Sequence, residues 1–228
     1  MIKSLRPIAS FAATSAATLL LLSPAASAAS PNNSTSPTFG GVTTSASDPT
    51  TTQASVQVPS AGTCVSGYDS SVGAGAILQG TLGKIGAAVY TQCVGGIPST
   101  QLVEYNYNQW ALLGDPNTVA PGDWITVKIA PAGTNYQARI YVPSGVAYVS
   151  GPIGNPAYTS VGIWPRRFDG AASRMPAFGS IRFSSVTPGA SYPVDLVTQS
   201  GSPRATTGMV LCGKGGIGCS FPVSYQHS

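Results

Sequence analysis

Short runs of β-branched and aromatic residues, separated by glycine, proline and asparagine, repeat along the chain from about residue 58 onward. Segment 124–129 is typical, because it alternates apolar and polar residues directly after the turn sequence Pro121-Gly122-Asp123. Such alternation places successive side chains on opposite faces of a strand. No segment shows the 3.6-residue periodicity of a helix over a useful length. The pattern predicts an all-β fold, an antiparallel two-sheet β-sandwich that is jelly-roll-like and lectin-like.

The first 28 residues have the organisation of a signal peptide. Lys3 and Arg6 give a basic start, an apolar run ends in four leucines at 19–22, and Ala-Ser-Ala at 26–28 supplies a small-residue cleavage site. The apolar run is shorter than the roughly 20 residues that a helix needs to cross a bilayer. We therefore expect a secreted protein, periplasmic or extracellular, with no membrane attachment after cleavage.

The segment that follows has a different composition. Residues 29–57 consist mainly of Ser, Thr, Asn, Pro, Ala and Gly, with Asp48 as their one charge. This composition offers little apolar surface to offset the entropy of ordering a chain. We expect a disordered leader or pro-segment over 29–57 and a single β-sandwich domain over 58–228.

The charge balance argues against a nucleic-acid partner. The chain has 11 basic and 7 acidic residues, and without Lys3 and Arg6 the balance is 9 to 7, or +2. That is no polybasic footprint. Four of the nine remaining basic residues fall within 166–182, where a solvated surface and an anion-binding site are both open; they are Arg166, Arg167, Arg174 and Arg182.

The chain contains four cysteines, Cys64, Cys93, Cys212 and Cys219. An even number in an exported chain predicts two disulfides, for which three pairings exist. We favour Cys64–Cys93 and Cys212–Cys219, because each closes a local loop; the chain-entropy description gives them about 3.6 and about 2.5 kcal/mol. A zinc site is the rival interpretation, but the spacings do not fit and the single histidine, His227, is the penultimate residue.

Several catalytic chemistries lack their residues. With one histidine near the end of the chain, Ser-His-Asp and Cys-His catalysis are excluded, and no phosphate loop or dinucleotide fingerprint occurs. We expect no cofactor and no metal. Any acid–base mechanism must use the six carboxylates beyond the leader, which are Asp69, Glu104, Asp115, Asp123, Asp169 and Asp195.

Seven short motifs follow one another along residues 67–225. They are Gly67-Tyr68-Asp69, Ile77-Leu78-Gln79-Gly80, Tyr107-Asn108-Gln109-Trp110, Pro121-Gly122-Asp123-Trp124-Ile125, the segment 160–169 around Trp164, Phe178-Gly179-Ser180-Ile181-Arg182-Phe183, and the closing segment 218–225. Each motif alone is common in β proteins. Their order resembles that of the glutamic peptidases, the eqolisin family of acid endopeptidases, in which a β-sandwich carries a concave substrate groove.

The resemblance implies specific roles and specific departures. Gln79 matches the family's catalytic glutamine, which orients a water and supports the oxyanion, while a glutamate acts as general base. The glutamate expected directly before Trp164 falls at Ile163, which has no polar atom. The family's groove glutamate falls at Gln109, and a neighbouring tryptophan falls at Tyr107. These departures predict that the glutamic-peptidase reaction is absent or severely weakened, so that the protein is a pseudoenzyme.

Period-two alternation and the resemblance together predict the layout of the groove. We expect Gln79, Tyr107 and Gln109 to project onto one concave face, with Asp69 at its edge and Trp164 as a further substrate-binding residue. Trp124 is expected to pack in the core.

Two other carboxylates could replace the missing glutamate. Glu104 does not share strand parity with Tyr107 and Gln109, so it is expected on the opposite face unless a bulge intervenes. Asp169 follows Trp164 by five residues and is expected in a loop.

Two functions therefore remain open. The first is a secreted glutamic-peptidase-like protein that binds an extended peptide or protein segment in the groove, with endopeptidase activity in question. The second is a non-catalytic secreted module that uses the same face to bind polysaccharide or peptide. The fold alone cannot separate them.

Overall fold

The computed structural model shows fifteen strands and no helix among the residues that it describes. The described residues are 34–36, 38–44, 51–60, 62, 64, 69–106, 109–113, 119–165, 175–187, 192–197, 203–213 and 218–225. Among them, no helix is long and apolar enough to span a membrane. The expected signal peptide, residues 1–28, lies outside these ranges.

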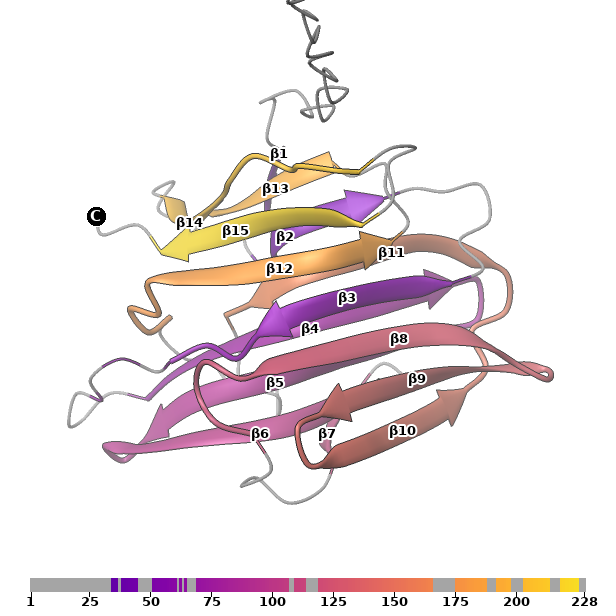
Figure 1. Cartoon of the computed structure of the whole chain (residues 1–228), viewed down its shortest axis with the longest axis horizontal. Coiled ribbons are helices and arrows are strands. Elements are labelled where there is room, and N and C mark those ends of the chain that lie inside the picture. The colour runs from indigo at the N-terminus through magenta and orange to yellow at the C-terminus, as the bar shows by residue number, and fades with distance from the viewer. Residues whose placement is uncertain are drawn as a thin grey trace, which may run out of the picture.

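The strands form two antiparallel sheets of seven strands, packed face to face (Figure 1). The first sheet has the order β10-β9-β8-β3-β12-β15-β14, and the second has the order β13-β2-β11-β4-β5-β6-β7. The strands are β1 (Ser34–Ser36), β2 (Gly40–Thr44), β3 (Thr52–Gln57), β4 (Ser70–Gly80), β5 (Lys84–Val94), β6 (Ile97–Asn106), β7 (Gln109–Leu112), β8 (Trp124–Ala132), β9 (Asn135–Val142), β10 (Gly145–Gly151), β11 (Pro156–Trp164), β12 (Ser180–Thr187), β13 (Tyr192–Val197), β14 (Pro203–Thr207) and β15 (Cys219–Tyr225). The predicted β-sandwich is confirmed.

The two sheets are also joined along one side. β13 of the second sheet pairs with β14 of the first through Leu196 and Ala205, so the hydrogen-bonded ladder passes from one sheet to the other. A short parallel strand, β1, pairs with β13. The sandwich is therefore closed at this side.

Alternating apolar residues fill the space between the sheets. In β8 the side chains of Ile125, Val127 and Ile129 are fully buried, while the residues between them face outward. Phe183 of β12 and Phe221 of β15 stack with ring centroids 4.8 Å apart. At about 25 cal/mol per Å² of apolar surface, each such buried side chain contributes about 1.5 to 3 kcal/mol to folding. The core is thus a single apolar layer between the two sheets.

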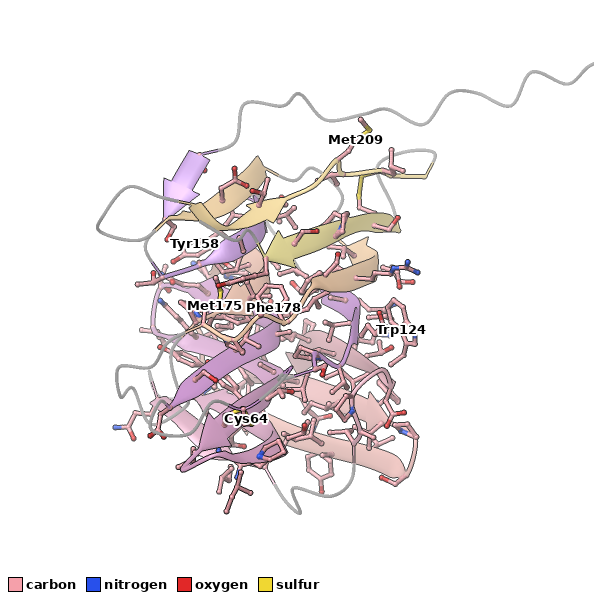
Figure 2. The ribbon with its side chains drawn as sticks, turned by 90° about the vertical axis from the view of Figure 1, so that its left-hand side faces the viewer. Cys64, Trp124, Tyr158, Met175, Phe178 and Met209 are labelled. Carbon is pink, nitrogen blue, oxygen red and sulfur yellow. A yellow bond between two sulfur atoms is a disulfide. The ribbon has the colours of Figure 1, made fainter. Side chains whose placement is uncertain are left out.

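The expectation for Trp124 is wrong. Its side chain is 44% exposed and lies on the outer face of the first sheet, as Figure 2 shows. The reason is strand parity, because Ile125 occupies the core face and its neighbour must point the other way.

The expected disordered segment 29–57 is also wrong for the residues that the structure describes. β2 lies between β11 and β13, and β3 lies between β8 and β12, so both are interior strands. In β3 the side chains of Thr52, Ala54 and Val56 are fully buried and alternate with half-buried polar ones. Composition misleads here, because neighbouring strands supply the apolar surface that the segment itself lacks. The domain therefore begins well before residue 58.

A hydrogen bond crosses the core between the sheets. The hydroxyl groups of Thr52 in β3 and Thr159 in β11 lie 2.8 Å apart and are buried. This hydrogen bond gives each hydroxyl group a partner inside the core, which avoids the cost of an unpaired buried polar group. The N-terminal strand β3 is thus tied by a polar contact to the second sheet.

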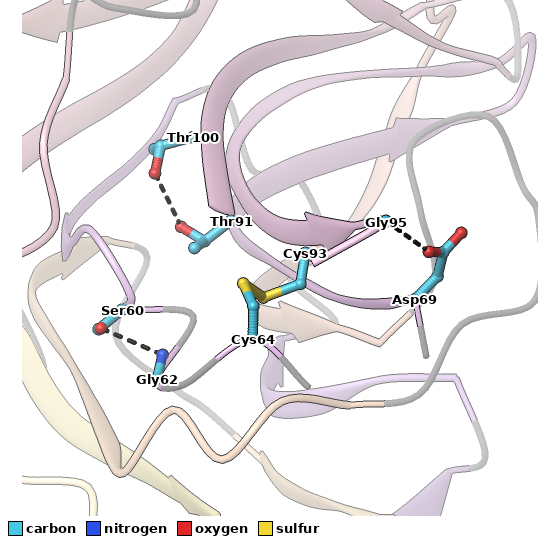
Figure 3. The surroundings of a disulfide bond; sticks show 8 residues. All are labelled: Ser60, Gly62, Cys64, Asp69, Thr91, Cys93, Gly95 and Thr100. Atoms are coloured by element: carbon cyan, nitrogen blue, oxygen red, sulfur yellow. Dashed lines mark hydrogen bonds between the residues drawn. A yellow bond between two sulfur atoms is a disulfide. The ribbon is translucent and has the colours of Figure 1, made fainter. Parts of the chain in front are cut away.

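Both favoured disulfides, Cys64–Cys93 and Cys212–Cys219, are present, and the described residues include no free cysteine. The first connects the segment before β4 to the end of β5 (Figure 3). The second joins Cys212 to Cys219, the first residue of β15, directly beside the Leu211–Ser220 bridge. The predicted local pairing is confirmed.

A truncation tests whether residues 34–57 belong to the domain. We expect a chain of residues 58–228 to remain unfolded, because removing β2 and β3 leaves four interior strand edges unpaired and removes Ala54 and Val56 from the core. A chain of residues 34–228, which keeps every described strand, is the control. Circular dichroism and urea unfolding would distinguish them, and a cooperative transition in the shorter chain would contradict the assignment.

Candidate functional site

The strand β4 has two covered faces, and they differ in character. Its core face carries Val72, Ala74, Ala76 and Leu78, all fully buried. Its other face carries Gly73, Gly75, Ile77 and Gln79, which point away from the sandwich core by alternation. Because the residues on this second face are mostly small, the sheet can be hollowed there.

A groove of about 550 Å³ lies on that outer face of the second sheet. Its described lining combines aromatic rings with amide and hydroxyl groups and one charged side chain, Lys84. The lining residues are Ser36, Thr38, Phe39, Thr43, Ile77, Gln79, Lys84, Tyr90, Tyr105, Tyr158, Ser160, Trp164 and Val194. None of them carries a carboxylate, and the described residues contain no group of three or more potential metal ligands.

Cross-strand register brings Gln79 and Tyr158 together. Gln79 of β4 pairs directly with Tyr158 of β11 on one side and with Lys84 of β5 on the other. The Tyr158 hydroxyl donates a hydrogen bond to Oε1 of Gln79. This bond fixes the orientation of the amide, so that its Nε2 group remains a donor for other partners.

Three tyrosines of the groove hold their protons strongly. Burial raises the pKa of Tyr90 and, to a smaller extent, the pKa values of Tyr105 and Tyr158. The neighbouring Tyr158 raises the pKa of Tyr105 further. A phenol with a raised pKa is a hydrogen-bond donor over the whole acid and neutral range and is no general base there.

The residue at the expected glutamate position faces the wrong way. Ile163 is fully buried in the core and pairs with Ala74, whereas Trp164 faces the groove and pairs with Gly73. Because the two residues are adjacent in one strand, only one can reach the groove. Ile163 therefore does not lie beside Gln79. The residue of β11 that pairs with Gln79 is Tyr158, six residues before Trp164.

Glu104 lies on the opposite face of β6 from Tyr105. It pairs with Ala87, a core residue, while Tyr105 pairs with Gly86 and lines the groove. Partial burial raises the pKa of the Glu104 carboxyl. The position of Glu104 away from the groove face agrees with the expectation, and no bulge interrupts β6 to reverse it. The expected contrast with Gln109 is wrong, because Gln109 pairs with Asn106 and so shares the face of Glu104.

The expectation that Gln79 and Gln109 share a face is wrong. β6 ends at Asn106 and β7 begins at Gln109, and these two residues pair with each other. Gln109 therefore shares the face of Asn106, opposite to that of Tyr105. The expectation assumed one continuous strand through 102–113. Tyr107 lies outside the described residues.

Asp69 lies far from Gln79, at the other end of β4. Its Oδ1 accepts a hydrogen bond of 3.2 Å from the backbone N–H of Gly95, in the turn between β5 and β6 (Figure 3). The predicted place at the edge of the groove is wrong, and the interaction is typical of a turn residue.

Trp164 is where the sequence predicted it, in the groove lining. Its ring packs against Phe39, with centroids 5.4 Å apart, and against the small cluster formed by Ala88, Tyr90 and Val103. Phe39 comes from the N-terminal segment that was expected to be disordered. Residues far apart in the sequence, Phe39 and Trp164, thus form one wall of the groove.

Most of the predicted arginine cluster cannot be placed at the site. Arg166, Arg167 and Arg174 lie outside the described residues, as does Asp169. Arg182 is exposed on the outer face of β12 in the first sheet, away from the groove.

Sequence reasoning missed Lys84, Tyr105 and Tyr158 as groove residues. The signal for Tyr158 was present, because residues 158, 160, 162 and 164 share the parity of Trp164. The place of Lys84 could have been inferred from that of Gln79, because a β4–β5 hairpin with a tight turn at 80–83 pairs these two residues. Tyr105 lies in β6, just before the strand break that follows Asn106, and its pairing with Gly86 of β5 places it on the groove face.

The fold and the groove define an antiparallel β-sandwich with an amide- and phenol-lined groove on the outer face of one sheet. No protein-family model matches the sequence, and no curated protein matches it. Solved structures do match, and glutamic peptidases are among them.

Three of the matching structures cover most of the described fold. Scytalido-glutamic peptidase with a transition-state analog inhibitor superposes with a TM-score of 0.58 at 14% identity, over 83% of this chain and 98% of its own. SCP-B, a member of the eqolisin family in a complex with the tripeptide Ala-Ile-His, gives 0.51 at 14% identity over the same shares. Aspergilloglutamic peptidase from Aspergillus niger gives 0.52 at 18% identity, over 68% of this chain and 99% of its own. The chain thus has the eqolisin β-sandwich fold, as its motif order predicted.

The buried phenol of Tyr90 and the half-buried phenols of Tyr105 and Tyr158 predict a loss of stability in alkali. Their pKa values lie above the ordinary 10.0 in the folded protein. The contribution of Tyr90 to stability is therefore complete below pH 10 and is lost as the pH rises toward its folded value, by at most about 1.4 kcal/mol per pH unit. Tyr105 and Tyr158 contribute less, because solvent screens them. Urea unfolding between pH 8 and 11.5 measures this slope. Tyr90→Phe should make it shallower, and an unchanged slope would contradict the assignment.

Proposed function

We propose that this protein is a divergent, exported relative of the glutamic peptidases that binds an extended peptide in the groove without cleaving it by the glutamic mechanism. The observation that carries the proposal is the pairing of Gln79 with Tyr158. A phenol, with its proton held by a raised pKa, stands beside the glutamine where catalysis would require a base.

The lining of the groove suits a peptide backbone. With Oε1 bonded to Tyr158, the Nε2 group of Gln79 can donate to a peptide carbonyl. Hydroxyl groups of Thr43 and Ser160 lie in the same lining and can donate or accept. Trp164 and Tyr105 offer apolar surface for side chains. The similar fold of SCP-B holds a tripeptide, which supports this ligand class.

Hydrolysis lacks a proton acceptor among the described groove residues. Ile163 faces the core and Glu104 lies on the other face of its strand. General acid–base catalysis typically contributes about 10² to 10⁴ in rate, so its loss would leave little turnover. The hydrogen bond from Tyr158 to Oε1 of Gln79 instead leaves the Nε2 group of Gln79 as the donor in the groove, an arrangement suited to holding a carbonyl.

The first experiment separates binding from cleavage. The purified protein is incubated with casein at pH 2 to 5, and its affinity for a random heptapeptide library is measured at the same pH values. We expect no cleavage and measurable binding, with Gln79→Ala weakening binding about 5- to 20-fold through the loss of one hydrogen bond. Asn155→Ala, outside the groove lining, is the control.

Two outcomes would overturn the proposal. Cleavage abolished by Asp169→Asn would place a working carboxylate in the segment that follows Trp164. Cleavage abolished by Glu104→Gln would show that this group reaches the groove from its own face. Either result would make the protein an active acid peptidase.

Polysaccharide is the second candidate ligand of the groove, and one observation favours it. Trp164, packed against Phe39, presents a fixed aromatic surface in the lining, and such surfaces stack on sugar rings as well as on peptide side chains. Binding of neutral oligosaccharides with no binding of peptides, lost in Trp164→Ala, would favour this candidate over the first.

We propose export on the strength of the first 28 residues, and the two disulfides agree with an oxidising compartment. N-terminal sequencing of the protein from culture medium would locate the cleavage. We expect the mature chain to begin after Ala28. A start beyond residue 44 would remove β2 and contradict both the site and the fold.

Lys84 predicts a preference within the ligand class. It is the one charged side chain among the described groove residues, and it pairs in register with Gln79. We expect Lys84→Gln to weaken binding of a peptide with a free terminal carboxylate about 5-fold, while an amidated peptide is unaffected. Arg182→Gln, on the outer face of the other sheet, is the charge-matched control. Equal loss for both peptides would contradict the role.

A further inference from the structure

A second surface with a distinct composition lies on the other side of the sandwich. It is the outer face of β8, β9 and β10, and we call it the platform. Tyr148, Val146, Trp124 and Tyr141 are 68%, 55%, 44% and 39% exposed there. Figure 2 shows Trp124 and the groove residue Tyr158 on opposite sides of the molecule. The platform is therefore independent of the groove.

The three aromatic residues of the platform lie on one diagonal. Tyr141 pairs with Thr126, two residues beyond Trp124 on β8, and with Val146, two residues before Tyr148 on β10. Each step along the diagonal crosses one strand and advances two residues, which separates successive residues by about 8 Å at the backbone. A straight line of three rings is thus presented to solvent.

Two cations face each other in the middle of this surface. Lys128 of β8 and Arg139 of β9 are directly registered partners, and both are exposed. Like charges in that position repel, and no described residue on the outer faces of these strands carries a carboxylate to offset them. An anion bound between them would remove the repulsion.

The guanidinium group is already oriented. Arg139 donates from Nε to Oε1 of Gln137 at 2.7 Å, and Gln137 donates from Nε2 to the Ser150 hydroxyl at 3.2 Å. The remaining guanidinium N–H groups stay available for a carboxylate, which can accept two parallel bonds. Tyr148 is the direct cross-strand neighbour of Arg139 on β10, so a ring and a fixed cation stand side by side.

We propose that the platform is a second binding site, for an acidic polysaccharide. Uronate carboxylates would bind between Arg139 and Lys128, and sugar rings would stack on Tyr148, Tyr141 and Trp124. The rest of the surface supports a sugar polymer, because its side chains are neutral hydrogen-bonding groups such as Thr126, Gln137 and Ser150.

Other occupants fit these observations less well. A polynucleotide needs a longer track of cations than one pair. A protein interface favours a contiguous apolar patch, whereas Thr126, Lys128 and Arg139 interrupt the apolar surface of the rings and Val146. The alternation of stacking surface with a single anion clamp matches a chain whose repeating unit carries both a ring and a carboxylate.

The test uses the full protein and polygalacturonate, with neutral galactan for comparison. Binding is measured by isothermal titration calorimetry at 20 and 200 mM salt. We expect binding of polygalacturonate that weakens about 10-fold at the higher salt, and weak or no binding of galactan. The double variant K128Q/R139Q should lose about 10-fold or more in affinity for polygalacturonate, and Tyr148→Ala should lose about 5-fold.

Two control variants separate the platform from other sites. Arg182→Gln removes the same charge from the outer face of the same sheet, three strands from Arg139, and should change affinity by less than about 2-fold. Gln79→Ala should have no effect, so the result stands whatever the groove binds.

Several results would overturn the proposal. They are equal affinity for galactan and polygalacturonate, stronger binding of single-stranded RNA, loss of binding in Gln79→Ala, and a dimer in sedimentation that Tyr148→Ala dissociates. Since Lys128, Arg139 and Tyr148 are all exposed, the variants should keep the fold; unchanged urea unfolding midpoints establish this.

Discussion

The structure depends on β4 being covered on both faces. One face must complete the core against the first sheet, while the other must leave room for a groove, and a single strand meets both demands by alternating Val, Ala and Leu with Gly, Ile and Gln. Gly73 shows how tight the second face is. A Cβ atom there would lie 2.3 Å from the ring of Tyr90, so the tyrosine lies flat on the sheet only because the glycine has no side chain. The wall of the groove beside Trp164 rests on that contact.

The same face determines the chemistry that the groove can perform. The Tyr158 hydroxyl donates a hydrogen bond to Gln79 and, with its raised pKa, stays protonated, so the amide has a fixed orientation. A carboxylate in the place of Tyr158 would put a proton acceptor beside an amide that can orient a water. On the function proposed above, this one strand position separates a binding groove from a hydrolytic one.

Much of the fold could be predicted from the chain, and the failures have physical reasons. The alternation in β8 identifies the strand, but the large apolar side chain of Trp124 suggested a place in the core. Ile125 and Val127 face the core instead, so Trp124 must point outward. Composition suggested disorder before residue 58, but β3 is buried because its neighbours cover it. Gln79 and Trp164 were found because the motifs around them resemble those of the glutamic peptidases, and both lie near the ends of strands β4 and β11. Gln109 was misplaced because a strand break after Asn106 changes which face follows, and no local pattern marks that break.

The order of strands in the sheets sets a condition on how the chain can fold. β2 completes its pairing only when β11 and β13 are available, and β3 only when β8 and β12 are. Both partners of β2 leave the ribosome more than a hundred residues after β2, and β12 does so more than a hundred residues after β3. Until then the first strands have exposed edges, and the pairing they await is of high contact order, which slows folding. The same interior positions of β2 and β3 oppose unfolding once the domain is complete. Neither β2 nor β3 can separate without opening the middle of a sheet, so the finished domain should unfold slowly and withstand proteolysis.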